Sequence, residues 1–169
     1  MKKIFLYFLI IFMIIGCSDS LNTPSNKVIN FLNKYINLDD EILIELDYQI
    51  ESNNYNYLEK NMYRDNMRRQ YKSLKYKIKE EKIYDDTAIV NVEIEVYNYA
   101  KAIENSSIYF LKNQDVFIND QNIVDTSKYI DHKLNEISKM NERITYDIEF
   151  NLYKKNKIWN LDKLIIQYY

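Results

Sequence analysis

The spacing of hydrophobic residues follows a helical pattern over the first part of the chain that comes after residue 22. Apolar residues recur at intervals of three and four in three successive segments, NTPSNKVINFLNKYINL, LDDEILIELDYQI and YLEKNMYRDNMRRQYKSL. This spacing is typical of amphipathic helices that each have one apolar side. Thr23 followed by Pro24 indicates the start of the first helix, Asp39 the start of the second, and ESNNYN a break before the third.

The spacing then changes to alternation, which predicts strands. LKYKIK alternates apolar residues with lysines, and TAIVNVEIEVYNYA alternates them with Asn91, Glu93 and Glu95. We expect two half-buried antiparallel strands joined near Asp85 and Asp86. Lysines on one outer face and glutamates on the next predict exposed cross-strand ion pairs, which contribute about 0.2–1 kcal/mol each.

Residues 101–125 have the weakest pattern in the chain. Ile108–Leu111 and Val116–Ile118 are short and apolar, and we expect either short strands or loop anchors there. The chain ends on a clear hairpin, in which RITYDIEFNLY alternates, KKNK turns, and IWNLDKLIIQYY returns with Trp159 and Leu161 on the inner face.

A further helix is predicted between these two regions, in TSKYIDHKLNEISKM, with Thr126 or Ser127 as its capping residue. Its inward side consists of Ile130, Leu134 and Ile137. His132 lies off that side, so we expect it to be exposed and without a functional role.

The order of these elements predicts an α+β fold, in which N-terminal helices pack on one face of a curved antiparallel sheet of about four strands. RRQYKSLKYKIKEEKIYDDTAIVNVEIEV and the closing YKKNKIWNLDKL resemble the NTF2-like and cystatin-like domains of small secreted and lipid-anchored bacterial proteins. In such domains helices precede a long curved sheet, and a polar turn leads to a strand with a buried tryptophan. The resemblance covers residues 23–100 and 143–165 and implies a fold rather than an activity, and the predicted helix near 127–140 interrupts the usual run of strands.

The first residues have a different organisation. Lys2 and Lys3 precede an unbroken apolar run from Ile4 to Ile15. The run is shorter than the ~20 residues that a membrane-spanning helix needs. Its length and its flanks are those of a signal peptide.

The residues IIGC that end this run resemble the lipobox of bacterial lipoproteins. The resemblance implies cleavage after Gly16, so that 1–16 is a signal peptide, 17–22 a lipidated cysteine with a polar tether, and 23–169 a single α+β domain. It implies that acyl chains such as palmitate are attached at Cys17, and stable anchoring takes more than one chain at ~0.8 kcal/mol per CH₂. The protein would lie at the cell membrane or the outer membrane, with its domain outside the cytoplasm. The alternative is an ordinary secretory signal followed by a chance cysteine.

The third predicted helix also carries a basic strip on its outer side, formed by Arg64, Arg68, Arg69 and Lys72. We interpret the strip as a solvated helix face. Contact with anionic lipid head groups is the alternative, because the anchor holds the domain near a membrane. The opposite, buried side is predicted to consist of Leu58, Met62, Tyr63, Met67, Tyr71 and Leu74.

Composition excludes several kinds of active site. Gly16 is the only glycine, Cys17 the only cysteine and His132 the only histidine. Phosphate-binding loops, dinucleotide fingerprints, nucleophile elbows, disulfides and His- or Cys-based metal sites are therefore excluded, and we expect no catalytic, cofactor-binding or metal-binding residues. The net charge of −2 becomes −4 when Lys2 and Lys3 leave with the signal peptide, which disfavours nucleic acid as a partner.

The anchor and the missing catalytic motifs favour a non-enzymatic binding or interaction module whose partner is a protein, a glycan or a small apolar ligand. Tyr97, Tyr99 and Tyr153 are predicted to point away from the core, as a partner face or as ordinary strand surface. Two alternatives stay open: a small enzyme with a carboxylate/tyrosine pair inside an NTF2-like cone, and a structural or inhibitory envelope protein. The strand acids fall on outward positions, which disfavours a buried base; they are Glu93, Glu95, Asp147 and Glu149.

Overall fold

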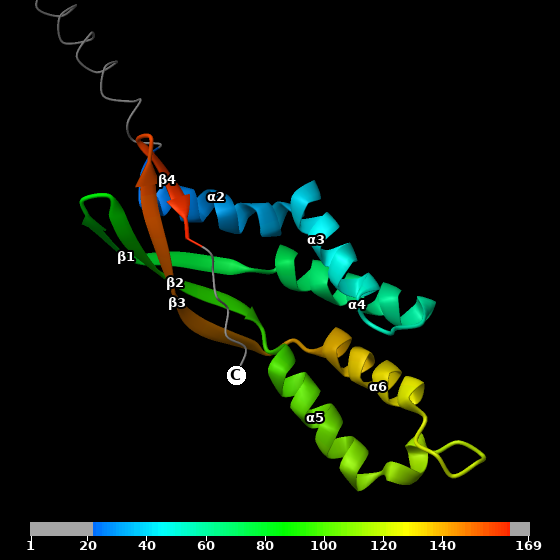
Figure 1. Cartoon of the computed structure of the whole chain (residues 1–169). Coiled ribbons are helices and arrows are strands. Elements are labelled where there is room, and N and C mark those ends of the chain that lie inside the picture. Colours follow the sequence, from blue (N-terminus) through cyan, green and yellow to red (C-terminus); the bar gives the residue numbers. More distant parts are fainter. Residues whose placement is uncertain (1–21, 163–169) are drawn as a thin grey trace, which may run out of the picture. The chain divides into compact units, whose positions relative to one another are not determined.

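A computed structural model describes residues 22–162, which form an α+β fold with five α-helices and an open four-stranded antiparallel sheet (Figure 1). The helices are α2 (Pro24–Asn37), α3 (Asp40–Glu51), α4 (Tyr57–Lys72), α5 (Tyr99–Lys112) and α6 (Thr126–Lys139), with a 3-10 helix η1 (Gln114–Phe117). The strands are β1 (Lys75–Tyr84), β2 (Thr87–Tyr97), β3 (Arg143–Lys155) and β4 (Ile158–Leu161).

The sheet order is β1-β2-β3-β4, with α5, η1 and α6 between β2 and β3 in the sequence. The predicted α+β class is confirmed. The predicted signal peptide and lipidated Cys17 lie outside the described residues, as does the end of the last predicted segment.

The described residues divide into two compact units. Unit 1 contains residues 22–33, 76–93 and 147–162, and unit 2 contains residues 34–75 and 94–146. Strands β2 and β3 therefore each contribute residues to both units.

Unit 1 combines the first part of α2 with the two hairpins. The Thr23 hydroxyl oxygen accepts a hydrogen bond from the Asn26 N–H at 3.1 Å, so Thr23 caps α2 as predicted and Pro24 is its first residue. Phe31 of α2 contacts Phe150 of β3 edge to face, with ring centroids 6.1 Å apart. The sheet contributes the other large part of this core, which consists of Ala88, Val90, Val92, Phe150, Leu152 and Trp159.

Both hairpins turn through left-handed backbone without using glycine. Asp85 between β1 and β2 has a φ of 50°, and Asn156 and Lys157 between β3 and β4 have φ values of 52° and 64°. Lys155 pairs with Ile158, so Asn156 and Lys157 form a two-residue turn of the kind whose twist matches an antiparallel hairpin. The turns predicted at Asp85 and at KKNK are confirmed.

Unit 2 is mainly helical. Helix α3 packs on α4, and α6 packs on both α4 and α5. On α3 the buried residues are Ile42, Leu46 and Ile50, which recur at intervals of four along the helix. A second core contains Ala102, Leu134 and Ile137, with Met62, Tyr63, Tyr99, Ile130 and Met140 packed against it.

Three predictions about unit 2 are wrong. Ile108–Leu111, expected as a short strand or a loop anchor, lies inside helix α5. Val116–Ile118 contains the end of η1 with the buried Phe117, and the isolated bridge between Ile118 and Val124 is the only β pairing described for 101–125. Leu58, predicted to be buried, is 58% exposed. The cap of α6 is Asp125, whose carboxylate accepts from the backbone N–H groups of Ser127 and Lys128 at 3.1 and 3.2 Å.

Candidate functional site

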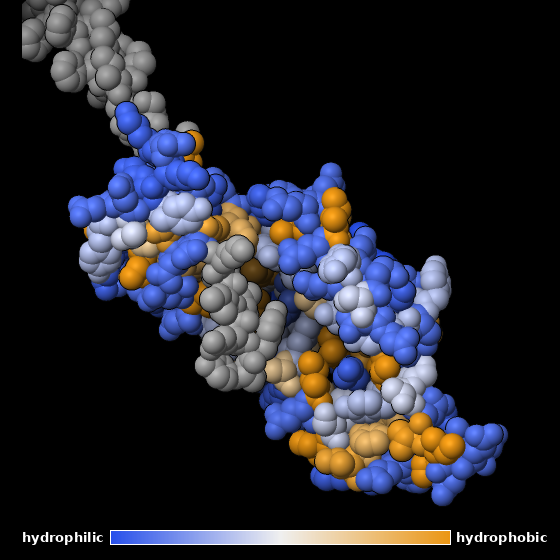
Figure 2. Space-filling model, in the orientation of Figure 1, coloured by the Kyte–Doolittle hydropathy of each residue, from blue (hydrophilic) through white to orange (hydrophobic). Residues whose placement is uncertain are grey.

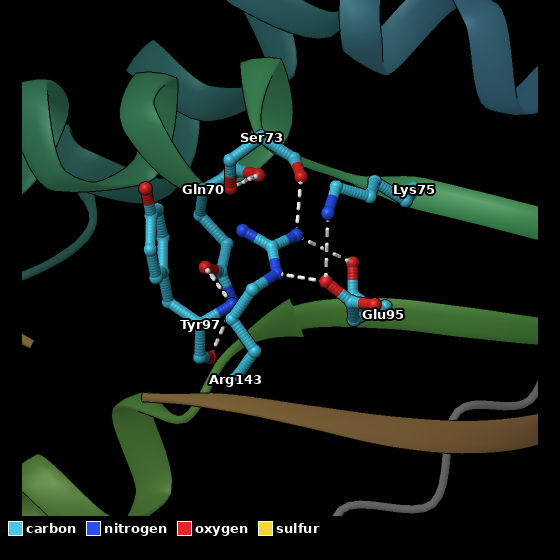
Figure 3. Close-up of polar contacts among 6 residues, drawn as sticks. All are labelled: Gln70, Ser73, Lys75, Glu95, Tyr97 and Arg143. Atoms are coloured by element: carbon cyan, nitrogen blue, oxygen red, sulfur yellow. Dashed lines mark hydrogen bonds and ion pairs between the residues drawn. The ribbon is translucent and has the colours of Figure 1, made fainter. Parts of the chain in front are cut away.

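A polar cluster in unit 2 surrounds Tyr97 at the end of β2 (Figure 3). The Arg143 guanidinium carbon lies 4.9 Å from the Tyr97 ring centroid. Its Nε donates to the Glu95 carboxylate, and its Nη2 donates to the carbonyls of Ser73 at 2.5 Å and Glu95 at 3.1 Å. Lys75 reaches the same carboxylate at 3.2 Å, so hydrogen bonds from Lys75 and Arg143 lower the pKa of Glu95.

Arg69 of α4 also lies over Tyr97, with its guanidinium carbon 4.0 Å from the ring centroid. Its terminal nitrogens donate to the carbonyls of Ser138 and Met140, at 2.7 Å each, where α6 ends. The last carbonyls of a helix have no partner within the helix, and a cation there complements the helix dipole. Arg69 therefore acts as an external cap for α6. Its remaining acceptors are the Ile137 carbonyl and the Asn141 side chain.

The predicted solvated basic strip on α4 is thus wrong in its main part. Arg69 is committed to α6, and Arg64 donates to the Asp47 carboxylate at 2.9 Å. Arg68 is half-buried, and its Nε forms no hydrogen bond within the described part of the chain. Lys72 is exposed, as predicted. Arg64 and Arg69 are therefore engaged in contacts within the fold.

Two of the three predicted outward tyrosines are also built into unit 2. Tyr97 and Tyr99 are half-buried, and their rings stack with centroids 6.1 Å apart and planes 11° apart. The Tyr99 hydroxyl donates to the Asn66 carbonyl at 2.9 Å, and burial raises the pKa of Tyr99. Tyr153 is exposed as predicted. Strand alternation, when extended to Tyr97 and Tyr99, predicts outward side chains. In the structure Arg69 of α4 covers the Tyr97 ring, and helix α5 begins at Tyr99.

A second polar cluster joins the first turns of α4 and α6. Glu59 is 2% exposed; its carboxylate accepts from the Asn56 N–H at 2.8 Å, while the Asn56 side chain accepts from the Glu59 N–H at 3.0 Å. The other Glu59 oxygen accepts from the Ser127 hydroxyl at 2.6 Å. Both carboxylate oxygens are thus occupied by groups at helix starts, where negative charge is favourable. The cluster therefore joins the starts of two helices.

Asp131 lies near this cluster and is less well satisfied. Its Oδ1 is buried and forms no hydrogen bond within residues 22–162. Burial, followed by repulsion from the carboxylates of Glu59 and Asp125, raises the pKa of Asp131.

Glu59 is an inward acid that the spacing of apolar residues does not indicate, because that spacing predicts the neighbouring Leu58 to be buried. The pair Asn56 and Glu59 has the three-residue spacing of a capping box, and this signal could have identified it. The strand acids that were placed outward are exposed or take part in ion pairs: Asp147 and Glu149 are exposed, Glu93 pairs with Lys79, and Glu95 pairs with Lys75 and Arg143.

His132 lies in an aromatic cluster, so its predicted exposure is wrong. Its ring stacks on Tyr109 at a centroid distance of 4.7 Å and meets the Phe117 ring at 5.6 Å. Phe117 is buried and also contacts Phe110 at 5.3 Å and Tyr129 at 6.0 Å. The sequence pattern of α6 alone identified one inward side, whereas α5 and η1 cover a second side that holds His132.

Beside this aromatic cluster, unit 2 exposes apolar side chains along α5 and the segment that follows it. Figure 2 shows orange atoms gathered over this part of the surface. We define the α5 surface as seven side chains, each 42–67% exposed: Ile103, Ile108, Tyr109, Leu111, Val116, Ile123 and Val124. Single exposed apolar residues are ordinary, but a group of them marks interaction sites.

The sequence of α5 does not indicate a helix, because its apolar residues lie on more than one side. Its buried side consists of the small residues Ala102 and Ser106, whereas Ile108 and Leu111 are exposed. A single apolar stripe is therefore absent from the sequence of this helix. Asn98, whose side chain accepts from the Lys101 N–H at 3.1 Å, is the cap that could have indicated the helix.

Across 22–162, no three His, Cys, Asp or Glu side chains are grouped in a way that could hold a metal ion. No helix in the same range combines the length and the apolar character needed to cross a membrane. The predicted attachment site Cys17 lies before this range.

No protein-family model, no curated protein and no solved structure matches the chain.

Proposed function

We propose that the protein is a lipid-anchored protein of the cell envelope that binds another protein through the α5 surface and has no enzymatic activity of its own. The sequence IIGC supports attachment through Cys17. The observation that carries the binding role is the exposed apolar group on α5 and the segment up to Val124.

The arrangement beneath the α5 surface favours a protein partner. Tyr109 belongs both to the surface and to the aromatic cluster, since its ring contacts His132 and Phe117. A surface whose side chains are held by a packed layer loses little conformational entropy on binding. Charged residues lie around it, as expected for the polar rim of a protein interface; they include Glu104, Lys112, Asp115, Asp120 and Lys128, all exposed.

The polar clusters of unit 2 offer less support for the enzyme alternative. The inward carboxylate of Glu59 uses both oxygens for helix starts, and the guanidinium groups of Arg69 and Arg143 donate to carbonyls and to Glu95. We assign these groups to folding. A glycan is less well matched than a protein because the α5 surface is apolar. A small apolar ligand is less well matched because the surface extends over a helix and the loop after it.

The assignment of the sheet to the NTF2-like or cystatin-like class is part of the same proposal. Three features support it: α2 precedes the sheet, a polar turn separates β3 from β4, and Trp159 on β4 is buried.

The binding role can be tested by photo-crosslinking in cells that make the protein. We expect a photoreactive amino acid at Leu111 to give one discrete adduct, because this side chain is the most exposed of the α5 surface at 67%. Asn135, an exposed polar residue on α6 of the same unit, is the matched control position and is expected to give none.

The adduct should also disappear when Ile108→Asp is added, since a charge at the centre of an apolar contact costs several kcal/mol of binding. No adduct from position 111, or the same adducts from position 135, would contradict the proposed interaction. An adduct between two copies of the chain would show that the α5 surface binds a second copy and not another protein.

A further inference from the structure

The described chain begins beside the turn that joins β3 and β4. The Asn22 side-chain amide donates to the Lys157 carbonyl at 2.7 Å, and Figure 1 shows the start of α2 next to this turn. Asn22 follows Cys17 by five residues. Five residues span at most about 18 Å when fully extended. An anchor at Cys17 therefore keeps the β3–β4 turn within about that distance of the membrane surface.

This turn is basic and carries an exposed apolar side chain. We define the hairpin tip as Lys154–Ile158, in which Lys154, Lys155 and Lys157 are exposed and Ile158 is 57% exposed. The tip is held in place: Lys155 pairs with Ile158, and the Lys154 ammonium lies 5.2 Å from the ring centroid of the buried Trp159. The lysines are thus presented by a defined turn rather than by a loose loop.

Two acids at this end of unit 1 lie in the other turn, and a third, Glu81, accepts a hydrogen bond from the Ser25 N–H at 2.7 Å. The Lys154 N–H donates at 2.7 Å to the carbonyl of Asp86, which precedes β2, and Asp85 is next to it. Since β2 begins there, Lys155, Asn156 and Lys157 continue past the start of β2. The two lysines furthest along the hairpin, Lys155 and Lys157, therefore lie past the backbone position of Asp86.

We propose that the hairpin tip contacts anionic lipid head groups and thereby orients unit 1 on the membrane, an inference that depends on the proposed attachment through Cys17. Each lysine near an anionic membrane surface favours contact by about five-fold. Ile158 adds apolar surface that can enter the head-group region. Once Lys2 and Lys3 leave with the predicted signal peptide, the net charge is −4, so an anionic membrane repels the chain as a whole and contact is favoured only where lysines gather.

The contact can be measured with a fluorophore at the tip of the full, lipidated chain. Because Cys17 is the only cysteine and its thiol carries the lipid, Ile158→Cys introduces a single reactive thiol for an environment-sensitive dye. The labelled protein is reconstituted on vesicles of phosphatidylcholine alone or with phosphatidylglycerol. We expect the dye emission to shift to the blue on the vesicles that contain phosphatidylglycerol and to stay unchanged on phosphatidylcholine.

The double variant Lys155→Glu/Lys157→Glu should lose the shift, since two charge reversals weaken the contact by more than about 25-fold. Lys72→Glu/Lys112→Glu is the matched control: both lysines are exposed in unit 2, the change in net charge is the same, and the shift should persist. Emission of Trp159, the only tryptophan, verifies that each variant is folded.

Three results would overturn this inference. A chain that sediments with both vesicle types without any shift excludes the tip contact and leaves the anchor intact. If the Lys72/Lys112 control loses the emission shift to the same extent, the shift depends on the net charge of the chain and not on contact at the hairpin tip. A wild-type chain that sediments with neither vesicle type overturns the anchor and the tip contact together.

Discussion

Glu59 and Asp131 are two acids of unit 2 whose surroundings affect stability in opposite ways. The Glu59 carboxylate accepts hydrogen bonds from Asn56 and Ser127 at two helix starts, so its burial is compensated. Asp131 has a buried oxygen without a hydrogen bond within the described residues, and nearby acids disfavour its charge. At the scale of single residues, burial is tolerated where donors are supplied and costs stability where they are not.

We expect Asp131→Asn to stabilise the protein at neutral pH. The pKa of Asp131 is raised above its ordinary 3.8, so the folded state holds a proton that the unfolded state has already released as the pH rises past that value. Stability is therefore lost as the pH increases through this window, and it stays lower above the raised pKa. The melting temperature of the variant should exceed that of the wild type at pH 7, and the difference should shrink as the pH approaches 3.8.

Asp65→Asn provides the comparison for this measurement, because Asp65 is exposed on the neighbouring helix α4. Its melting temperature should follow the wild type at every pH. If Asp131→Asn lowers stability at pH 7, the buried oxygen is being satisfied in a way that the asparagine cannot reproduce.

Among the elements, α6 shows how the end of one helix depends on a side chain from another. Arg69 of α4 supplies hydrogen bonds to the carbonyls of Ser138 and Met140, and its guanidinium also lies over Tyr97. The planar fork of arginine reaches several acceptors at once, which the single ammonium of lysine cannot do. Helices α4 and α6 are therefore coupled by polar contacts as well as by packing.

We expect Arg69→Ala to lower the free energy of unfolding by about 2–4 kcal/mol, because it leaves several carbonyls of a half-buried helix end without donors. Arg69→Lys should recover less than half of that loss. Chemical denaturation followed by circular dichroism measures both. The control is Arg64→Ala on the same helix, which breaks the ion pair with Asp47 and should cost about 1 kcal/mol or less. Equal effects at the two positions would contradict a capping role for Arg69.

Across the whole molecule, two units carry different parts of the proposed function. The described part of unit 1 begins five residues after Cys17 and carries the hairpin tip, whereas unit 2 carries the α5 surface. Strands β2 and β3 contribute to both units, so the chain passes between them along regular structure. In the proposed function, the anchor determines where the protein is, and unit 2 determines what it binds.

We expect Cys17→Ser to abolish lipidation, so that the chain either leaves the membrane or stays there only in unprocessed form, with its leader uncut. Serine lacks the thiol that receives the lipid, and ~0.8 kcal/mol of burial per CH₂ of the acyl chains is lost. In fractionated cells the variant should move from the membrane pellet to the soluble fraction or remain unprocessed at its leader. Asp19→Asn, two residues further on, is the control and should stay in the pellet. A serine variant that still sediments and matures like the wild type would exclude lipidation at this position.

Much of the fold follows from local sequence. Helix α2 is indicated by Thr23 and Pro24 and by apolar residues at intervals of three and four. The two hairpins are indicated by alternation of apolar and polar residues, with polar turns at Asp85 and at Asn156. These features are predictable because each depends on residues that are close in the chain, through 3.6- and 2-residue periods and through turn preferences. The resemblance of the first residues to a lipoprotein signal is likewise local.

The sequence by itself thus determined the α+β class, most helix and strand positions and the absence of glycine- or thiol-based chemistry from the part of the chain after Cys17. The tertiary structure decided which polar residues are buried and which apolar ones remain exposed. Arg69 meets Ser138 across 69 positions and Glu59 meets Ser127 across 68, and no pattern along one element contains such a partner. For the same reason the α5 surface is decided by the packing of α6 and η1 on other sides of that helix. A residue's burial depends on everything packed around it, and in a folded chain most of that comes from elsewhere in the sequence.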